Sequence, residues 1–130
     1  TTMRQMFCRC SELESLQLTN FNTSNVTTME SMFYRCSKLS SLDITNFDTS
    51  KVTTMKQMFC GCSELTTIYA NSSFSTASVT DSSNMFLNST KLVGGSGTTY
   101  SSTNPTDITY AHIDGGPTNP GYFTDIADKP

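Results

Sequence analysis

Apolar residues recur along this chain at a nearly constant interval. The clearest markers are the Met-Phe pairs at positions 6–7, 32–33, 58–59 and 85–86, whose successive spacings are 26, 26 and 27 residues. The apolar positions around each pair repeat as well, whereas most polar positions do not. A fixed period in this range predicts a solenoid, in which each coil rests on the coil before it and all coils share one core.

Two shorter hydrophobic periods are present within each coil. Residues 16–18 and 42–44 alternate between apolar and polar side chains, which is typical of a short strand with one buried face. Residues Val26, Met29, Met32 and Phe33 follow the i, i+3, i+6, i+7 spacing of a helix. Each coil is therefore predicted to contain one short parallel strand and one helical segment.

The chain divides by composition into a repeat region and an irregular cap. Residues 1–92 hold about 3.5 coils, with all seven methionines and all five cysteines. Residues 93–130 hold all four prolines and every glycine except Gly61, a composition that is typical of turns. We expect an α/β repeat solenoid of the leucine-rich-repeat type, closed by a Gly/Pro-rich C-terminal cap.

Residues 6–29 carry a resemblance to a known family. They run from Met6-Phe7-Cys8-Arg9-Cys10 through Leu-x-x-Leu-x-Leu at 13–18, and they resemble the BspA-type leucine-rich repeat of bacterial surface proteins and mycoplasma-type lipoproteins. Residues 92–98, 110–116 and 119–123 resemble the end cap of the same proteins. The resemblance implies a surface-exposed protein that makes adhesive or host contacts. It offers no catalytic residues to carry over.

Composition and charge narrow the function classes. The net charge is −3 without a basic cluster, which argues against nucleic acid as a partner. No apolar run approaches the 18 or so residues that a membrane-spanning helix needs. The abundant Ser and Thr, with only 15% charged residues, suit an exported chain, and we expect a bacterial cell-surface or secreted location. The start at Thr1, inside a coil, predicts a mature or trimmed fragment.

The five cysteines leave alternatives open. Cys10, Cys36 and Cys62 occupy one repeat position, and Cys8 and Cys60 occupy another. Stacked strands lie ~4.8 Å apart, so the first three can form a buried column of small apolar side chains, or a Cys10–Cys36 or Cys36–Cys62 disulfide. Zinc is less favoured, because a Cys-x-Cys spacing is shorter than that of zinc sites. We expect no metal and no cofactor.

Charged residues alternate in sign at two repeat positions. One position holds Glu12, Lys38, Glu64 and Lys91, and the other holds Arg4, Glu30 and Lys56. Opposite charges on neighbouring coils attract one another, whereas like charges repel. We interpret these columns as devices that keep the coils in register. The open ends of the columns could also direct the docking of another molecule.

The outward strand positions form a candidate ligand face, because this face commonly binds ligands in leucine-rich repeats. It is small and polar with a single aromatic side chain, so a plain solvated face is the alternative interpretation. Its members are Gln17, Thr19, Asp43, Thr45, Tyr69 and Asn71.

The first coil is a candidate stacking end. An uncapped coil exposes apolar side chains and unpaired backbone groups, so we expect either upstream residues or another surface to cover it. Contact with the C-terminal end of an identical chain would be head-to-tail and could propagate into a filament. The apolar residues at this end are Met3, Met6, Phe7, Leu13 and Leu16.

Catalytic chemistry is not indicated. The single histidine, His112, lies near Asp114 in sequence, but the sequence ties no nucleophile to it. Glycosylation is a hypothesis only, at the sequons of Asn22, Asn25, Asn71 and Asn88. We therefore expect a non-catalytic extracellular interaction or adhesion module that binds a protein or cell-surface ligand. The alternative is a structural protein that stacks head to tail.

Overall fold

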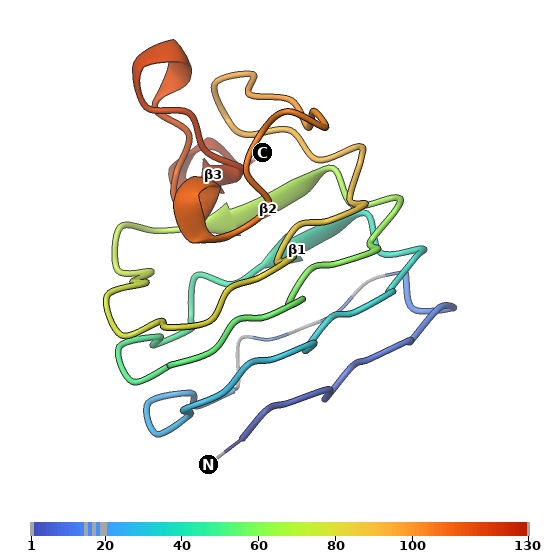
Figure 1. Cartoon of the computed structure of the whole chain (residues 1–130), viewed down its shortest axis with the longest axis vertical. Coiled ribbons are helices and arrows are strands. Elements are labelled where there is room, and N and C mark those ends of the chain that lie inside the picture. The colour runs from blue at the N-terminus through green and yellow to red at the C-terminus, as the bar shows by residue number, and fades with distance from the viewer. Residues whose placement is uncertain (1, 15, 17, 19–20, 130) are drawn as a thin grey trace.

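Successive coils of the chain lie one above the other, from the N-terminus at one end of the molecule to an irregular cap at the other (Figure 1). The computed structural model describes residues 2–14, 16, 18 and 21–129. Its elements, in chain order, are strands β1 (Ser41–Asp43) and β2 (Thr67–Ala70), 3₁₀ helices η1 (Ile108–Tyr110) and η2 (Gly116–Thr118), strand β3 (Phe123–Asp125) and 3₁₀ helix η3 (Ile126–Asp128).

Alternate backbone amides join each coil to the next. Between the second and third coils, the N–H groups of Met29, Ser31, Phe33 and Arg35 donate to carbonyls 25 residues further along, at 2.8–3.0 Å. The first coil bonds to the second in the same way, and the third bonds to the segment that follows it. Isolated parallel bridges link one threonine per coil in the series Thr2, Thr28 and Thr54. The 26-residue period is therefore the distance along the chain between residues that the hydrogen bonds between coils bring side by side.

The predicted helical segment is wrong. Residues 29–36 instead form three overlapping turns, in which the amides of Met32, Tyr34 and Cys36 each donate to the carbonyl three residues earlier. Ser31 and Arg35 have φ of 55° and 58°. A helix would need every amide for bonds within its own segment, but the amides between these three are committed to the next coil. The apolar residues Val26, Met29, Met32 and Phe33 are nevertheless all buried in the core.

Two of the predicted strands are present. β1 and β2 are parallel, with Leu42 opposite Ile68 and Asp43 opposite Tyr69. The third strand of the sheet, β3, comes from the end of the cap, and it pairs Tyr69 with Thr124. The strand predicted over residues 16–18 of the first coil includes residue 17, which lies outside the described residues. The leucine-rich-type solenoid class itself stays a prediction.

A column of phenylalanines runs through the core. The rings of Phe7, Phe33, Phe59 and Phe86 stack with centroids 5.5–5.7 Å apart and planes within 7–8° of each other. The last three rings are fully buried. Phe123 of the cap meets Phe86 edge-on at 6.1 Å, so the column ends against an aromatic residue of the cap.

The cap also covers backbone donors of the segment after the third coil. The amide of Phe86 donates to the Thr106 carbonyl at 2.9 Å, and the amide of Asn88 donates to the Tyr100 hydroxyl at 3.1 Å. Buried backbone groups need such partners, because an unpaired amide costs about as much as a lost hydrogen bond. The cap therefore ends the backbone ladder by supplying acceptors.

Asp114 holds the loops of the cap together. Its buried carboxylate accepts hydrogen bonds from the amides of Ser96 and Thr98 at 2.9 and 3.0 Å, from the Thr98 hydroxyl at 2.8 Å and from the amides of Gly116 and Gly121 at 2.9 and 3.3 Å. Burial alone would raise the pKa of this carboxyl, but the donors from Thr98, Gly116 and Ser96 outweigh burial and lower it to about 2. The glycine-rich loop at residues 94–97 therefore binds the carboxylate of the protein's own Asp114, through the Ser96 amide.

The phenylalanine column predicts a position-dependent loss of stability. Phe59→Ala removes a fully buried ring with neighbours on both sides, and we expect the free energy of unfolding to fall by about 3–5 kcal/mol. Phe7→Ala removes a half-buried ring at the end of the column and should cost clearly less. Urea denaturation of both variants measures the difference. Equal losses would contradict a continuous core.

The low pKa of Asp114 predicts a loss of stability in acid. An ordinary Asp has a pKa near 3.8 and the folded-state value is about 2, so the stabilisation is complete above about pH 5 and disappears as the pH falls through 2. It amounts to about 2 kcal/mol. Asp114→Asn should lose it at neutral pH. Urea denaturation at pH 6 and pH 2.5 should therefore show a larger pH dependence in the wild type than in the variant.

Candidate functional site

The predicted ligand face lies on the outer side of the sheet. Asp43 and Tyr69 are opposite each other in the β1–β2 register, and the Asn71 side-chain amide donates to the Thr45 carbonyl at 3.1 Å. The structure thus brings four of the six predicted residues together, and all four are half-buried. Gln17 and Thr19 lie outside the described residues.

Lys129 lies across this face. Its ammonium nitrogen is 3.6 Å from an Asp43 carboxylate oxygen and 5.4 Å from the centre of the Tyr69 ring. Burial raises the pKa of Asp43, but the Thr45 hydroxyl and amide, together with Lys129, lower it below its ordinary value. The sequence offered no signal for this contact, because Lys129 belongs to no repeat.

A separate hollow on the described surface lies at the corner where the turn segments lead toward the strands. It has a volume of about 670 Å³, and its lining includes Arg9, Tyr34, Arg35, Gln57 and Gly61. None of the described residues that line it is acidic. We call it the arginine groove, and it shares no residue with the ligand face.

Tyr34 holds both arginines of the arginine groove. The guanidinium carbons of Arg9 and Arg35 lie 5.8 and 5.3 Å from the ring centre, within the range of cation–π attraction. The Arg35 Nε also donates to the Tyr34 hydroxyl at 3.1 Å. The aromatic ring therefore restricts two long side chains that would otherwise move freely in solvent.

A glycine opens the arginine groove. The repeat position of Arg9 and Arg35 is occupied by Gly61 in the third coil and by Asn88 after it. A Cβ at Gly61 would come within 3.0 Å of Arg35 Cγ. All four residues have positive φ, from 58° to 76°. The 26-residue register alone could have indicated this column, but our sequence analysis missed it.

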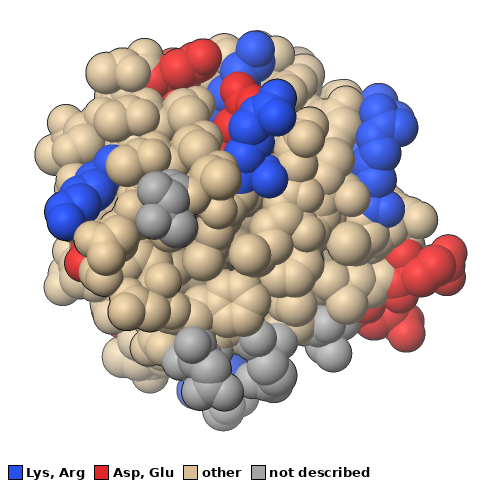
Figure 2. Space-filling view, turned by 90° about the horizontal axis from the view of Figure 1, so that it is seen from below, with Lys and Arg blue, Asp and Glu red and all other residues tan. Residues whose placement is uncertain are grey.

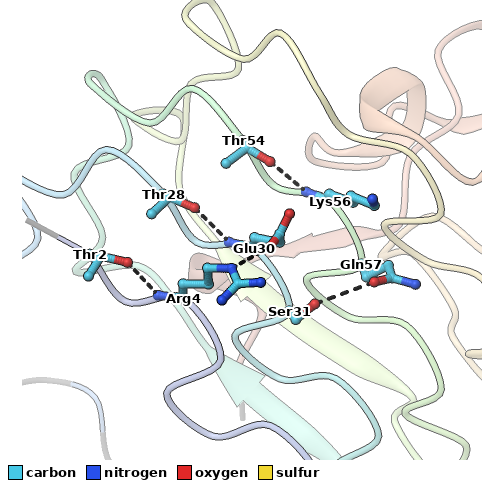
Figure 3. Close-up of polar contacts among 8 residues, drawn as sticks. All are labelled: Thr2, Arg4, Thr28, Glu30, Ser31, Thr54, Lys56 and Gln57. Carbon is cyan, nitrogen blue, oxygen red and sulfur yellow. Dashed lines mark hydrogen bonds and ion pairs between the residues drawn. The ribbon is translucent and has the colours of Figure 1, made fainter.

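The charge columns form ion pairs between coils. Lys38 lies 2.9 Å from Glu12, Lys91 lies 2.9 Å from Glu64, and Arg4 pairs with Glu30. Figure 3 shows the last pair beside a repeated turn, in which the hydroxyls of three threonines accept from the amides two residues on. These contacts support our interpretation that the columns keep the coils in register.

The N-terminal end of the molecule is uncharged over its centre, with charged side chains around the rim (Figure 2). Met6 is 47% exposed there, and the other predicted stacking residues, Met3, Phe7, Leu13 and Leu16, are half-buried. Backbone carbonyls of the second coil accept hydrogen bonds from amides of the first coil. The carbonyls of Arg4, Met6 and Cys8 occupy the equivalent positions in the first coil. This end therefore presents backbone acceptors to whatever lies next to it.

All five cysteines are free thiols. The Cys36 and Cys62 thiols donate to the carbonyls of Phe7 and Phe33 at 3.0 and 3.1 Å, and Ser89 makes the equivalent bond to Phe59. Burial raises the pKa of Cys36 to about 11 and that of Cys62 to about 12. This repeat position therefore acts as a column of buried hydrogen-bond donors. Among the described residues, no three His, Cys, Asp or Glu side chains gather to hold a metal ion.

The residues that the sequence suggested for catalysis or glycosylation do not come together in one site. His112 Nδ1 lies 2.9 Å from the Ile113 carbonyl, and the Asp114 carboxylate is engaged by loop amides. Of the sequon residues, Asn22, Asn25 and Asn88 are exposed and Asn71 is half-buried. The side-chain nitrogen of Asn71, which a glycan would require, donates to Thr45.

Hydrogen-bonded coils with side-chain columns on their outer faces define a repeat protein. The chain belongs to the family described as "Mycoplasma protein of unknown function, DUF285", which matches residues 1–113. No curated protein and no solved structure matches the chain. None of the helices in the described part of the chain has the length and apolar character needed to cross a membrane.

The burial of the cysteines predicts selective labelling. The thiolate is the reactive form, so at pH 8 a maleimide should modify the half-buried Cys8 and Cys10 in the native protein. Cys36, Cys60 and Cys62 are buried and should react only after unfolding in urea. Peptide mass mapping identifies the labelled sites. Native labelling of Cys62 at the rate of Cys8 would contradict the buried column.

Proposed function

We propose that this protein is a non-catalytic interaction module of a bacterial cell surface or its secreted material. It is built as a leucine-rich-type solenoid of the BspA kind, and its ligand is a protein or another cell-surface molecule. The resemblance of residues 6–29 to BspA-type repeats and the DUF285 match over residues 1–113 support this proposal. The low charge and abundant hydroxyl groups of the chain agree with an extracellular location.

The observation that carries the proposal is the clustering on the ligand face. Asp43 and Tyr69 meet across the β1–β2 register, and Thr45 and Asn71 are joined by a hydrogen bond beside them. Tyrosine is among the side chains that contribute most to binding energy at interfaces. Lys129 lies over the Tyr69 ring and near Asp43, so the lysine covers the aromatic and acidic side chains that a ligand would contact.

Head-to-tail stacking is the second candidate. The uncharged centre of the N-terminal end and the carbonyls of the first coil favour contact with another coil. However, the Phe86 and Asn88 amides at the opposite end already donate to Thr106 and Tyr100 of the cap. A second copy approaching that end would not find these donors available, so the interaction module is the better supported function.

The proposal predicts opposite effects of two substitutions on the ligand face. The assay measures binding of the labelled chain to a panel of purified extracellular-matrix proteins and to whole epithelial cells. Tyr69→Ala should weaken binding about tenfold or more, because it removes a hot-spot side chain. Lys129→Ala should strengthen binding about twofold to fivefold, because a ligand no longer has to displace the lysine from the ring and the carboxylate.

Lys51→Ala is the matched control for the lysine, because Lys51 is exposed and lies outside this face. Thermal unfolding of each variant separates lost binding from lost folding. The proposal that this face contacts the ligand would be overturned if the wild type bound in the assay and neither Tyr69→Ala nor Asp43→Ala reduced that binding.

A further inference from the structure

We propose that the arginine groove is a binding site for an acidic oligosaccharide, with the guanidinium groups of Arg9 and Arg35 holding carboxylate or sulfate oxygens. The groove shares no residue with the ligand face, so this site goes beyond the proposed function and does not depend on it.

The first argument is a break in the charge pattern. At two other repeat positions of the stack, neighbouring coils carry opposite charges, and Glu12 pairs with Lys38, Glu64 with Lys91 and Arg4 with Glu30. Arg9 and Arg35 place two positive charges on neighbouring coils at one repeat position. Like charges opposite each other destabilise the contact between strands. Among the described residues neither arginine forms an ion pair, so no carboxylate neutralises the two charges and an external anion would relieve their repulsion.

The second argument is that both guanidinium groups are held in place before any ligand arrives. Each lies within 6 Å of the Tyr34 ring centre, and Arg35 is fixed further by its bond to the Tyr34 hydroxyl. A guanidinium is a planar fork that matches the two oxygens of a carboxylate or sulfate. Restricting it in advance lowers the entropy lost on binding.

The rest of the lining selects a sugar among anionic ligands. Gln57, Asn88 and Ser37 add neutral donors and acceptors, which suit the hydroxyl groups of a sugar. The volume of about 670 Å³ lies within the range of small-ligand sites. A long nucleic acid would require an extended basic surface, whereas this chain has a net charge of −3. The lining includes few apolar side chains that could anchor an acidic peptide.

Gly61 is what makes the groove. In the first two coils this position carries an arginine side chain, and in the third coil it carries none. Asn88 adopts the same left-handed backbone, with φ of 66° against 76° at Gly61, and asparagine tolerates this conformation better than most residues. Gly61→Asn therefore fills the groove with a residue that the repeat already uses at this position.

The test is isothermal titration of the full chain at low salt with two tetrasaccharides. One comes from hyaluronan and carries carboxylates only, and the other comes from heparin and also carries sulfates. Binding of either supports the site, and their relative affinities identify the anion. Arg9→Ala and Arg35→Ala should each weaken binding about tenfold or more, because a hydrogen bond to a charged group is lost. Gly61→Asn should also weaken binding.

Three controls keep the result specific. Lys51→Ala removes one positive charge outside the groove and, in a matched titration at about 0.1 M salt where the Debye length is ~10 Å, should change the affinity less than about twofold. Arg35→Lys keeps the charge but loses the planar fork, and it should fall between the wild type and Arg35→Ala. Tyr69→Ala should leave oligosaccharide binding unchanged, which separates this site from the ligand face.

The proposal would be overturned if neither tetrasaccharide bound at low salt. It would also be overturned if Lys51→Ala weakened binding as much as Arg35→Ala, because the attraction would then be unspecific. Tighter binding of an oligothymidylate or an oligoglutamate peptide than of both sugars would likewise reject an oligosaccharide as the ligand.

Discussion

The hydrogen bonds from alternate amides of one coil to carbonyls of the next are the constraint on which the rest of the structure depends. They fix the distance between coils and the register at which residues 26 apart become neighbours. They also decide the conformation within a coil, because an amide that donates to the next coil is lost to a helix. The intervening amides then close short turns, and residues such as Ser31 and Arg35 adopt positive φ.

Every side-chain column is a consequence of this register. The stacked phenylalanines provide a continuous core, the Cys36 and Cys62 thiols with the Ser89 hydroxyl cover carbonyls beside it, and opposite charges pair on the surface. The chemical character of each column is set by the residue type that the sequence places at that repeat position. The arginine column is the exception to charge pairing, and Gly61 interrupts it with an opening. The features that could carry function are thus the departures from the repeat.

The cap completes the stack by reproducing its interactions with residues that do not follow the period. β3 extends the parallel sheet beside β2, Thr106 and Tyr100 accept from amides of the preceding segment, and Phe123 ends the ring column. Asp114 supplies the anion around which the cap loops fold. The same region brings Lys129 over Tyr69 and Asp43, so the cap shapes the face that we propose for ligand binding.

The repeat length, the residues of the core, the strands β1 and β2 and the ion pairs between coils could all be predicted from the sequence. Each of these follows from the spacing of residue types along the chain, because a constant period makes equivalent positions neighbours. The turns at residues 29–36 became clear only from the fold, since the apolar spacing is the same whether the amides bond within the coil or to the next coil. The positions of Lys129 on the ligand face and of β3 in the sheet also became clear only from the fold. Both lie outside the repeat, so the repeat spacing does not indicate which residues they contact. The arginine groove combines both cases. Its column could be predicted from the sequence, but the positions of the guanidinium groups depend on how the Tyr34 ring packs beside them.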